Sequence, residues 1–570
     1  MKRFLSAFIA VAMMVTMLAS CGAPASSATP VPTGSAAPAP APAEKAKTWE
    51  EAGCKTPLAD VRIRQALAYA IDMDAIVNSL FEGKAEVATS MTAPGDWLAT
   101  GLESYSYNVE KAKALLTEAG WPAGYTLDVV YYYGDQQTVD LMTIIGQYWS
   151  DVGVKAQFRK LEGDLTQQLW IPPADKVNGP AEVKWDMAYA AVAALAEHEF
   201  YDRFMSTAAN NSNLPKQDGL DELILATSAT ADTQKQIKAF NEVQKAMNAN
   251  VYQMPLYHQV AFIYTSDQID TKGNKFGNEQ FAYQKNIPDW ETKRADKTLY
   301  TNEGPIEFFF FPNVNPGGTA AELIFDTLIA ADSQLNPTEG LMAESYKLSD
   351  DQLNLEFVLR DDQTWHDGKP VTPEDVKFSV ELYLKAAGTN SIAANTFKSI
   401  KGAKEFAEGK AGDISGIVID GKKITMQFEK IAPNALTVFA QWPILPKHLL
   451  SKVDPLKAQQ DAFWQKPVGS GEFMVDQVKN GDHCTLKRNP NYWKKGTGNI
   501  EKVWMFASSG DGDPNLTKNA EAGKIDFAWG KSTDDAKAIE KIAGMTTNVA
   551  KIRYTRLFYI NQFPHEPNIK

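Results

Sequence analysis

The sequence predicts a mixed α/β fold in two lobes, with helices on both faces of a mixed or parallel sheet. Helical and strand-like segments alternate along most of the chain, which is the rhythm of βαβ units. The composition changes after Gln268, where Gly, Asn, Lys and Gln dominate to about Lys285 before strand patterns resume. We therefore expect one lobe over residues 55–265 and the other over residues 266–570.

Composition and charge exclude several classes of protein. Of the 570 residues, 44% are hydrophobic and 22% are charged, which is typical of a globular protein and not of a disordered or fibrous one. The formal net charge is −13, whereas nucleic-acid binders normally present a basic surface. Six histidines and three cysteines leave little material for a His-rich metal site or a disulfide scaffold. We therefore expect no nucleic-acid partner, no metal and no cofactor.

The N-terminal segment has the pattern of an export signal. Lys2 and Arg3 precede an apolar run that is shorter than the ~20 residues a bilayer span needs. The run ends in Leu-Ala-Ser before Cys21, which resembles a bacterial lipobox and predicts a signal peptide at residues 1–20 with a lipid on Cys21. The alternative is an ordinary signal peptide cleaved nearby. Residues 21–54, mostly Ala, Pro, Ser and Thr, are expected to form a flexible tether, so that the protein is extracytoplasmic and reaches the membrane through its lipid only.

Helix and strand patterns follow one another through the first half. Apolar residues recur at helix spacing over 60–80, with Asp60 as the cap, and over 108–119, which Gly120 ends. Aromatic and β-branched residues predict a strand over 125–133. The remaining expected elements are a helix over 137–152, a strand over 154–159, and alternating strands and helices as far as Asn561.

Motifs of the second half resemble a known family. They are the segment 359–379 with Trp-His-Asp-Gly at 365–368, Trp-Pro-Ile-Leu-Pro-Lys-His at 442–448, Pro-Val-Gly-Ser-Gly at 467–471, Leu-Lys-Arg-Asn-Pro-Asn-Tyr-Trp at 486–493 and Gly-Lys-Ile-Asp at 523–526. In this order they are similar to the family 5 extracellular solute-binding proteins of ABC importers for peptides, nickel and oligosaccharides. The resemblance implies a two-lobe periplasmic-binding-protein fold (type II, cluster C-like) whose lobes close on a ligand.

The order of the two halves departs from the family. The first half carries the family's later motifs, at 60–72 and 107–120, whereas relatives have the Trp-His-Asp-Gly half first. The family's two termini would then be joined near 286–300. We interpret this order as a circular permutation, which nearby chain ends permit. The alternative is a mis-assembled gene.

Cys54 and Cys484 stand beside the proposed cut and in a strand of the other lobe. Exported proteins hold disulfides, and a bridge here would replace a lost connection between the lobes. The alternative is two unrelated buried thiols. The sequence leaves this pairing open.

The resemblance assigns ligand contacts to both lobes. In the 266–570 lobe it points to the loop after the first strand and to one tryptophan, which gives Phe311, Asn313, Asn315, Gly317, Gly318, Thr319 and Trp442. In the 55–265 lobe it points to the end of the strand over 125–133 and to an acidic stretch, which gives Tyr133, Asp135, Gln136, Glu197 and Glu199. Dipeptide-binding relatives place an arginine and an Asp-Pro turn at these points, and the sequence has neither there.

The expected function follows from the resemblance. We expect a monomeric, lipid-anchored substrate-binding protein that captures an oligopeptide and delivers it to the permease and ATPase subunits of an ABC importer. An oligosaccharide stacked on tryptophans, or an envelope sensor or chaperone on the same fold, are the alternatives. We expect no enzyme, because the sequence has no HExxH, GxSxG or P-loop motif.

Overall fold

The computed structural model describes residues 46–274, 276, 286–303, 308–333, 335–494, 496–508 and 514–566. Residues 47–570 form one compact unit, and residues 1–46 are assigned to a separate one. Cys21, the expected signal peptide and most of the expected tether lie outside the described residues. None of the described helices is both long enough and apolar enough to cross a bilayer.

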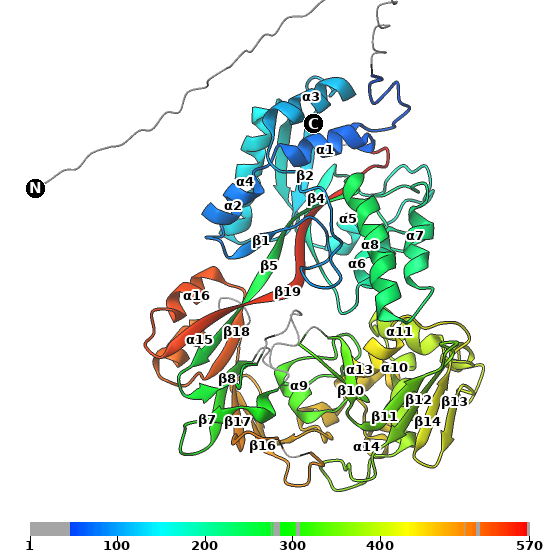
Figure 1. Cartoon of the computed structure of the whole chain (residues 1–570), viewed down its shortest axis with the longest axis vertical. Helices are drawn as coiled ribbons and strands as arrows, with labels where there is room; N and C mark the ends of the chain where they lie inside the picture. The colour runs from blue at the N-terminus through cyan, green and yellow to red at the C-terminus, as the bar shows by residue number, and fades with distance from the viewer. Residues whose placement is uncertain are drawn as a thin grey trace, which may run out of the picture. The chain divides into compact units, whose positions relative to one another are not determined.

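The largest sheet of the described residues is an 11-stranded mixed sheet (Figure 1). Its strands in spatial order are β15 (Phe473–Lys479), β16 (His483–Arg488), β17 (Lys502–Ala507), β8 (Thr298–Glu303), β18 (Phe527–Gly530), β5 (Gln253–Ser266), β19 (Met545–Ile560), β4 (Met187–Ala193), β2 (Thr126–Tyr131) and β3 (Lys155–Lys160), and β1 (Ala85–Val87) pairs with β5. Strand β2 runs parallel to β3 and β4, while β19 runs antiparallel to β4 and β5. The expected mixed α/β architecture is confirmed.

Side chains alternate between the two faces of this sheet near β4. Met187 and Tyr189 pack on one face with Leu67 of α1, whereas Ala188 packs on the other face with Phe240 of α8. The helices and 3₁₀ turns of this part, which we name the α8 lobe, are η1 (Pro57–Ala59), α1 (Val61–Tyr69), α2 (Met73–Ser79), α3 (Val109–Ala119), α4 (Gln136–Asp151), α5 (Leu165–Leu169), α6 (His198–Tyr201), η2 (Asp202–Phe204), α7 (Leu220–Thr227) and α8 (Thr233–Ala249). Helices therefore cover both faces, as expected.

The helix expected over 60–80 is interrupted. Asp60 caps α1 as predicted, but the helix ends at Tyr69 and α2 begins after Asp72. The carboxylate of Asp72 accepts a hydrogen bond from the Ala75 amide (2.9 Å), which starts a new helix. A second cap therefore overrides continuous apolar spacing.

The other lobe, which we name the α10 lobe, carries a second, antiparallel sheet. Its other elements are β6 (Ile269–Asp270), η3 (Ile287–Asp289), β7 (Glu291–Thr292), α9 (Thr319–Ile324), β9 (Ile329–Ala331), β10 (Pro337–Gly340), β11 (Ala343–Leu348), β12 (Asn354–Leu359), α10 (Pro373–Lys385), α11 (Ser391–Lys398), α12 (Ala403–Ala407), β13 (Ile417–Asp420), β14 (Lys423–Gln427), α13 (Ala435–Gln441), α14 (Lys447–Leu450), η4 (Pro455–Gln460), η5 (Ala462–Gln465), α15 (Pro514–Glu521) and α16 (Thr533–Ile539). The second sheet has the order β11-β12-β14-β13.

Two long strands, β5 and β19, pass between the lobes. They pair with each other from Met545 opposite Ser266 to Tyr559 opposite Gln253. The end of β19 packs in the α8 lobe, because Leu557 and Phe558 belong to the apolar clusters on the two faces of β4. The division at residue 265 stays a prediction, and the end of the 266–570 segment packs with the other segment.

No disulfide joins Cys54 to Cys484. Cys54 lies in the turn before η1, where burial raises the pKa of its thiol. Cys484 is fully buried in β16, next to the edge strand of the α10 lobe. The bridge considered from the sequence is therefore not formed, because Cys54 lies before η1 and Cys484 lies in β16, and both thiols are free.

Candidate functional site

The parallel strands of the α8 lobe end beside β19, and the side chains at that edge form a cage of aromatic rings around one arginine. Tyr133 follows β2, and its hydroxyl lies 2.8 Å from that of Tyr132. The guanidinium of Arg556, on β19, lies 3.8 Å from the centre of the Tyr133 ring and 5.1 Å from that of Tyr554. The carboxyl ends of parallel strands are where open α/β sheets bind ligands.

The hydrogen-bond donors of Arg556 are only partly paired within the protein. Its Nε donates to the Gln259 side chain (3.2 Å), while its buried Nη1 has no hydrogen-bond partner. The hydroxyl groups of Tyr189, Tyr257 and Tyr133 surround it, and no carboxylate in the described part of the chain forms an ion pair with it. A cation withdrawn from water without an anion is costly. The cage therefore holds a cation that is not neutralised by any carboxylate of the described residues.

Asp135 and Gln136, which the sequence assigns to ligand binding, form local hydrogen bonds at the start of α4. Both carboxylate oxygens of Asp135 accept hydrogen bonds from Thr138, one from its amide and one from its hydroxyl, each at 2.9 Å. Asp135 is thus the N-cap of α4. Gln136 donates to Asp140 one turn further on (2.8 Å). These contacts explain both residues as parts of the helix start beside the cage.

The two glutamates of the acidic stretch, Glu197 and Glu199, form hydrogen bonds within the protein. Glu197 is buried, accepts a hydrogen bond from the Thr92 hydroxyl (2.9 Å) and lies 4.0 Å from Arg553. Glu199 accepts the Leu195 amide (2.6 Å) and the Asn390 side chain of the other lobe (3.2 Å). Burial raises the pKa of both carboxyl groups. The assignment of these residues to ligand binding has no direct support in their contacts.

The loop before α9 contributes less to a cleft than expected. Phe311 is buried and stacks on Tyr383, with ring centres 5.5 Å apart. Asn313 is fully buried and donates to the Ala387 carbonyl (2.7 Å), while its side-chain oxygen accepts from Gln459 (3.1 Å). Because these contacts are made within the fold, they give no support to the assignment of Phe311 and Asn313 as ligand contacts, which stays a prediction.

The rest of that loop divides between core and pocket. Asn315, Gly317 and Gly318 are half-buried. Gly318 has a φ of 130°, a backbone conformation that residues with a side chain rarely adopt. Thr319 is buried, and its hydroxyl has no hydrogen-bond partner. Of these four residues, Gly317 lines a pocket in the structure.

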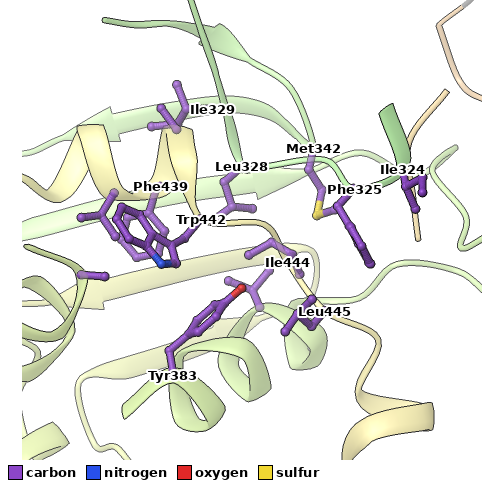
Figure 2. Packing of buried hydrophobic residues seen from close by; sticks show 14 of the residues in the cluster. Ile324, Phe325, Leu328, Ile329, Met342, Tyr383, Phe439, Trp442, Ile444 and Leu445 are labelled. Carbon is purple, nitrogen blue, oxygen red and sulfur yellow. The ribbon is translucent and has the colours of Figure 1, made fainter. Parts of the chain in front are cut away.

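Trp442 belongs to the core of the α10 lobe. Figure 2 shows its indole among the apolar side chains of the cluster, near Phe439 and Leu328. The side chain is 2% exposed, so it offers no surface for stacking a ligand. Its burial gives no support to its assignment as a ligand contact, which stays a prediction.

A pocket of about 240 Å³ opens beside Gly317. It is bounded by α9, by the segments that follow α9 and α13, and by Leu195 of the α8 lobe. Asp326 and Gln441 stand in its wall, and both are buried. Neither residue belongs to a recognisable motif, and the 115 positions between them leave no local sequence pattern that would group them.

A second pocket of about 240 Å³ lies inside the α8 lobe, bounded by α1, α8 and the segment around Tyr105. Within the described part of the chain, no three or more His, Cys, Asp or Glu residues are grouped so as to hold a metal ion.

Comparison with known proteins identifies the family. The family model for bacterial extracellular solute-binding proteins, family 5 Middle, matches residues 33–212 and 338–567. The chain belongs to this family. The resemblance drawn from the motifs is thereby confirmed, and family 5 proteins are defined by solute binding and by their place outside the cytoplasm.

Several relatives of this family 5 protein are named for peptides. A putative ABC transporter peptide-binding protein of Brucella ovis is 28% identical over 234 residues, and the match spans 40% of each chain. A probable peptide-binding protein, YejA, of Agrobacterium fabrum is 31% identical over 182 residues, or 31% of this chain and 27% of that one. The lactococcal OppA structure with an endogenous peptide matches 43% of this chain and 47% of that one, at 21% identity and a TM-score of 0.37. The chain thus spans less than half the length of each of these relatives.

Proposed function

We propose that this family 5 protein is the substrate-binding component of an ABC importer. In this proposal it captures an oligopeptide between its two lobes and delivers it to the permease and ATPase subunits of the importer. The names of the relatives in Brucella and Agrobacterium support the peptide class and the importer. The proposal includes a monomeric protein held at the membrane by a lipid on Cys21, as the lipobox pattern suggests.

One observation carries the ligand class: the guanidinium of Arg556 has a buried nitrogen without a partner and no ion-paired carboxylate in the described residues. A peptide ends in a carboxylate, which accepts charge-assisted hydrogen bonds from an arginine in a planar, directed geometry. Tyr133 and Tyr554 flank the same guanidinium and present apolar ring surface to the rest of a ligand.

An oligosaccharide fits the observations less well. A neutral sugar has no anion to satisfy Arg556, and it needs exposed flat rings. Trp442 is core, and the Trp170 ring is already covered by the Arg203 guanidinium (4.4 Å) and by Tyr559 (5.0 Å). We therefore propose a peptide and not an oligosaccharide as the ligand.

The test is to identify the ligand and then remove its proposed anchor. Native mass spectrometry of the purified protein should reveal retained peptides. Isothermal titration should then show that a peptide with a free C-terminus binds more tightly than its C-terminal amide. We expect Arg556→Gln to abolish this difference and to cost about 2–5 kcal/mol of binding free energy for the free acid, because a buried charge pair loses one partner.

Lys155→Gln is the matched control, since Lys155 is exposed at the opposite end of β3 from the cage. It should bind both peptides as the wild type does. Retention of a ladder of hexose masses would overturn the peptide class, and equal affinity of the wild type for acid and amide would overturn the role of Arg556.

A further inference from the structure

The pocket of about 240 Å³ inside the α8 lobe is separate from the proposed peptide site. Every described residue of its wall comes from that lobe, namely from α1, α2, β1, α6, α8, the start of β5 and the segments between them. It shares no described residue with the pocket beside Gly317 or with the rings around Arg556. A molecule held here therefore leaves the place of a peptide between the lobes free.

The inner wall of this pocket is built of apolar side chains. Ile71, Met91, Met247, Met254 and Leu256 line it, and each is at most 6% exposed. Three of them are methionines, whose polarizable thioethers pack well against aromatic rings. The volume exceeds the roughly 150 Å³ of an engineered apolar cavity that stays dry and binds benzene. The pocket is thus large enough for an aromatic ring with a small substituent.

The buried polar side chains on the α8 side of the wall are paired with one another. The Ser90 hydroxyl donates to Gln244 Oε1 (3.1 Å) and lies 3.0 Å from the Tyr201 hydroxyl. The Gln244 side chain in turn donates to the Trp97 carbonyl (2.8 Å). Because these groups already have partners, they do not call for water or for a polar ligand.

The described wall offers no buried charge. Its acidic residues are Asp74 and Glu103, both of which are exposed, and it contains no basic residue. A charged group that entered the pocket would lose its water without gaining a buried partner of opposite charge. The wall therefore selects an uncharged molecule.

One donor in the wall remains unpaired. Gln253 is 3% exposed, and its side-chain oxygen accepts a hydrogen bond from the Ile560 amide (3.2 Å), which fixes the orientation of the side-chain amide. Among the described wall residues, Gln253 Nε2 is the one buried side-chain nitrogen or oxygen without a hydrogen-bond partner. A buried donor without an acceptor is costly, so an acceptor on a ligand would be favoured.

The segment 103–107 lies over the pocket and is held in place by α8. Tyr105 has a φ of 47°, which residues with a side chain rarely adopt, and its hydroxyl donates to the Asn248 carbonyl (2.9 Å). The Asn248 side chain donates to the Glu103 carbonyl (3.0 Å) and accepts from the Glu103 amide (2.8 Å). These bonds oppose collapse of the segment into the pocket.

We propose that this pocket is a second binding site, for a small uncharged aromatic molecule that carries one hydrogen-bond acceptor. The ring lies among the methionine side chains, and the acceptor takes a hydrogen bond from Gln253 Nε2. Such a ligand is bound in addition to the peptide and at a different place.

An NMR titration of protein labelled at the methionine methyl groups tests this proposal. The probes are acetophenone, ethylbenzene, which keeps the ring and lacks the acceptor, and benzoate and 1-phenylethylammonium, which place a charge where acetophenone has its carbonyl group. We expect acetophenone to shift the resonances of Met91, Met247 and Met254 and to bind about 5-fold more tightly than ethylbenzene, as one neutral hydrogen bond allows. Neither charged probe should bind at the same concentration. The resonances of Met342 and Met426, buried in the α10 lobe, should stay unchanged.

Two substitutions of opposite effect assign the binding to the pocket. Met247→Trp fills the pocket and should abolish the shifts of Met91 and Met254. Met91→Ala enlarges it and should bind 2-acetonaphthone, which has a second ring, about 10-fold more tightly than the wild type does. Leu456→Trp adds the same indole at a position that is 68% exposed, and this control should keep the wild-type affinity for acetophenone.

A cooperative thermal unfolding transition shows whether each variant is folded. If Met247→Trp does not fold, the gain expected of Met91→Ala still decides the matter, because misfolding cannot produce tighter binding of a larger probe.

The opposing outcomes are specific. The absence of any shift with millimolar acetophenone, or shifts of Met342 and Met426 as large as those of the pocket methionines, would overturn the site. Charged probes that bind as tightly as acetophenone would overturn the uncharged class, and equal affinities for acetophenone and ethylbenzene would overturn the role of Gln253. None of these results bears on peptide binding, so the proposed function is tested separately.

Discussion

The carboxyl group of Asp326 is largely withdrawn from water. The residue is 5% exposed, its oxygens accept hydrogen bonds from Tyr492 (3.2 Å) and Gln363, and the carboxyl group of Glu472 acts on it electrostatically. Burial raises the pKa of Asp326 to about 8, above the ordinary value of 3.8, and the two hydrogen bonds oppose that rise.

This raised pKa predicts how stability changes with pH. As the pH rises above about 4, Asp326 ionises in the unfolded chain but stays protonated in the folded one, so its contribution to stability is lost progressively up to about pH 8. We expect the free energy of unfolding of the wild type to fall relative to Asp326→Asn over this range, by at most about 1.4 kcal/mol per pH unit. Urea unfolding of both proteins at pH 4, 6 and 8 measures the difference. A constant difference would show that Asp326 titrates normally.

The residues of the site were accessible to sequence reasoning only in part. Tyr133 was found because it ends a recognisable strand, and it does line the cage. Arg556 was missed because it comes from β19, more than 400 positions away, and only the pairing of β19 with β4 brings it over Tyr133. The burial of Asn313 and Trp442 could not be predicted, because residue type does not reveal whether a side chain packs inside the fold.

Among the elements, the turn between β11 and β12 forms a contact between the lobes. Gln352 has a φ of 59°, and its side-chain oxygen accepts hydrogen bonds from the Ala231 amide (2.6 Å) and the Thr230 hydroxyl (3.3 Å). In α8, Gln236 donates to the Pro433 carbonyl of the α10 lobe (2.9 Å). These bonds join the N-terminal end of α8 to the α10 lobe.

Gln352→Gly tests what this contact does. Glycine accepts a positive φ without strain, so the turn should keep its shape while both hydrogen bonds across the lobes disappear. We expect the unliganded variant to show a larger radius of gyration by small-angle scattering, because nothing in the turn then opposes opening. Lys347→Ala, an exposed change on β11, should leave scattering unchanged. Identical profiles for wild type and Gln352→Gly would mean that the contact does not hold the lobes together.

Elements themselves were predictable where a local signal exists. Asn108 and Gly120 bound α3 as their capping chemistry requires. The length of β19 was not predictable, because its first part pairs in one lobe and its last part in the other, and periodicity carries no information about partners.

For the whole molecule, we propose that the exchanged order of the family motifs is a circular permutation. Its support is that both described ends lie on one side of the α8 lobe. Trp49 donates its amide to the Ala119 carbonyl at the end of α3 (2.8 Å), and His565 lies 2.9 Å from Asp186, which Tyr125 also contacts. The Trp121 and Tyr125 rings, 5.5 Å apart, connect these two places.

A reordered chain tests this proposal. Joining Glu566 to Lys47 through a flexible linker of about ten residues and opening the chain between the exposed Ala295 and Asp296 restores the order of the relatives. We expect one cooperative unfolding transition and unchanged binding of the retained ligand, because the packing is the same. Aggregation of the reordered chain, or loss of ligand, would contradict the proposal.

The crossing of β19 also determines where a mechanical load would act. Trp49 and His565 are both attached to the α8 lobe, so a force applied between the two described ends runs through that lobe alone. The chain enters the α10 lobe through β5 and returns from it through β19. These two strands are paired with each other, so the α10 lobe lies beyond a paired two-stranded ribbon. Under tension the end of β19 would peel from β4 first, and the α10 lobe would bear no load until the β5–β19 ribbon itself gave way.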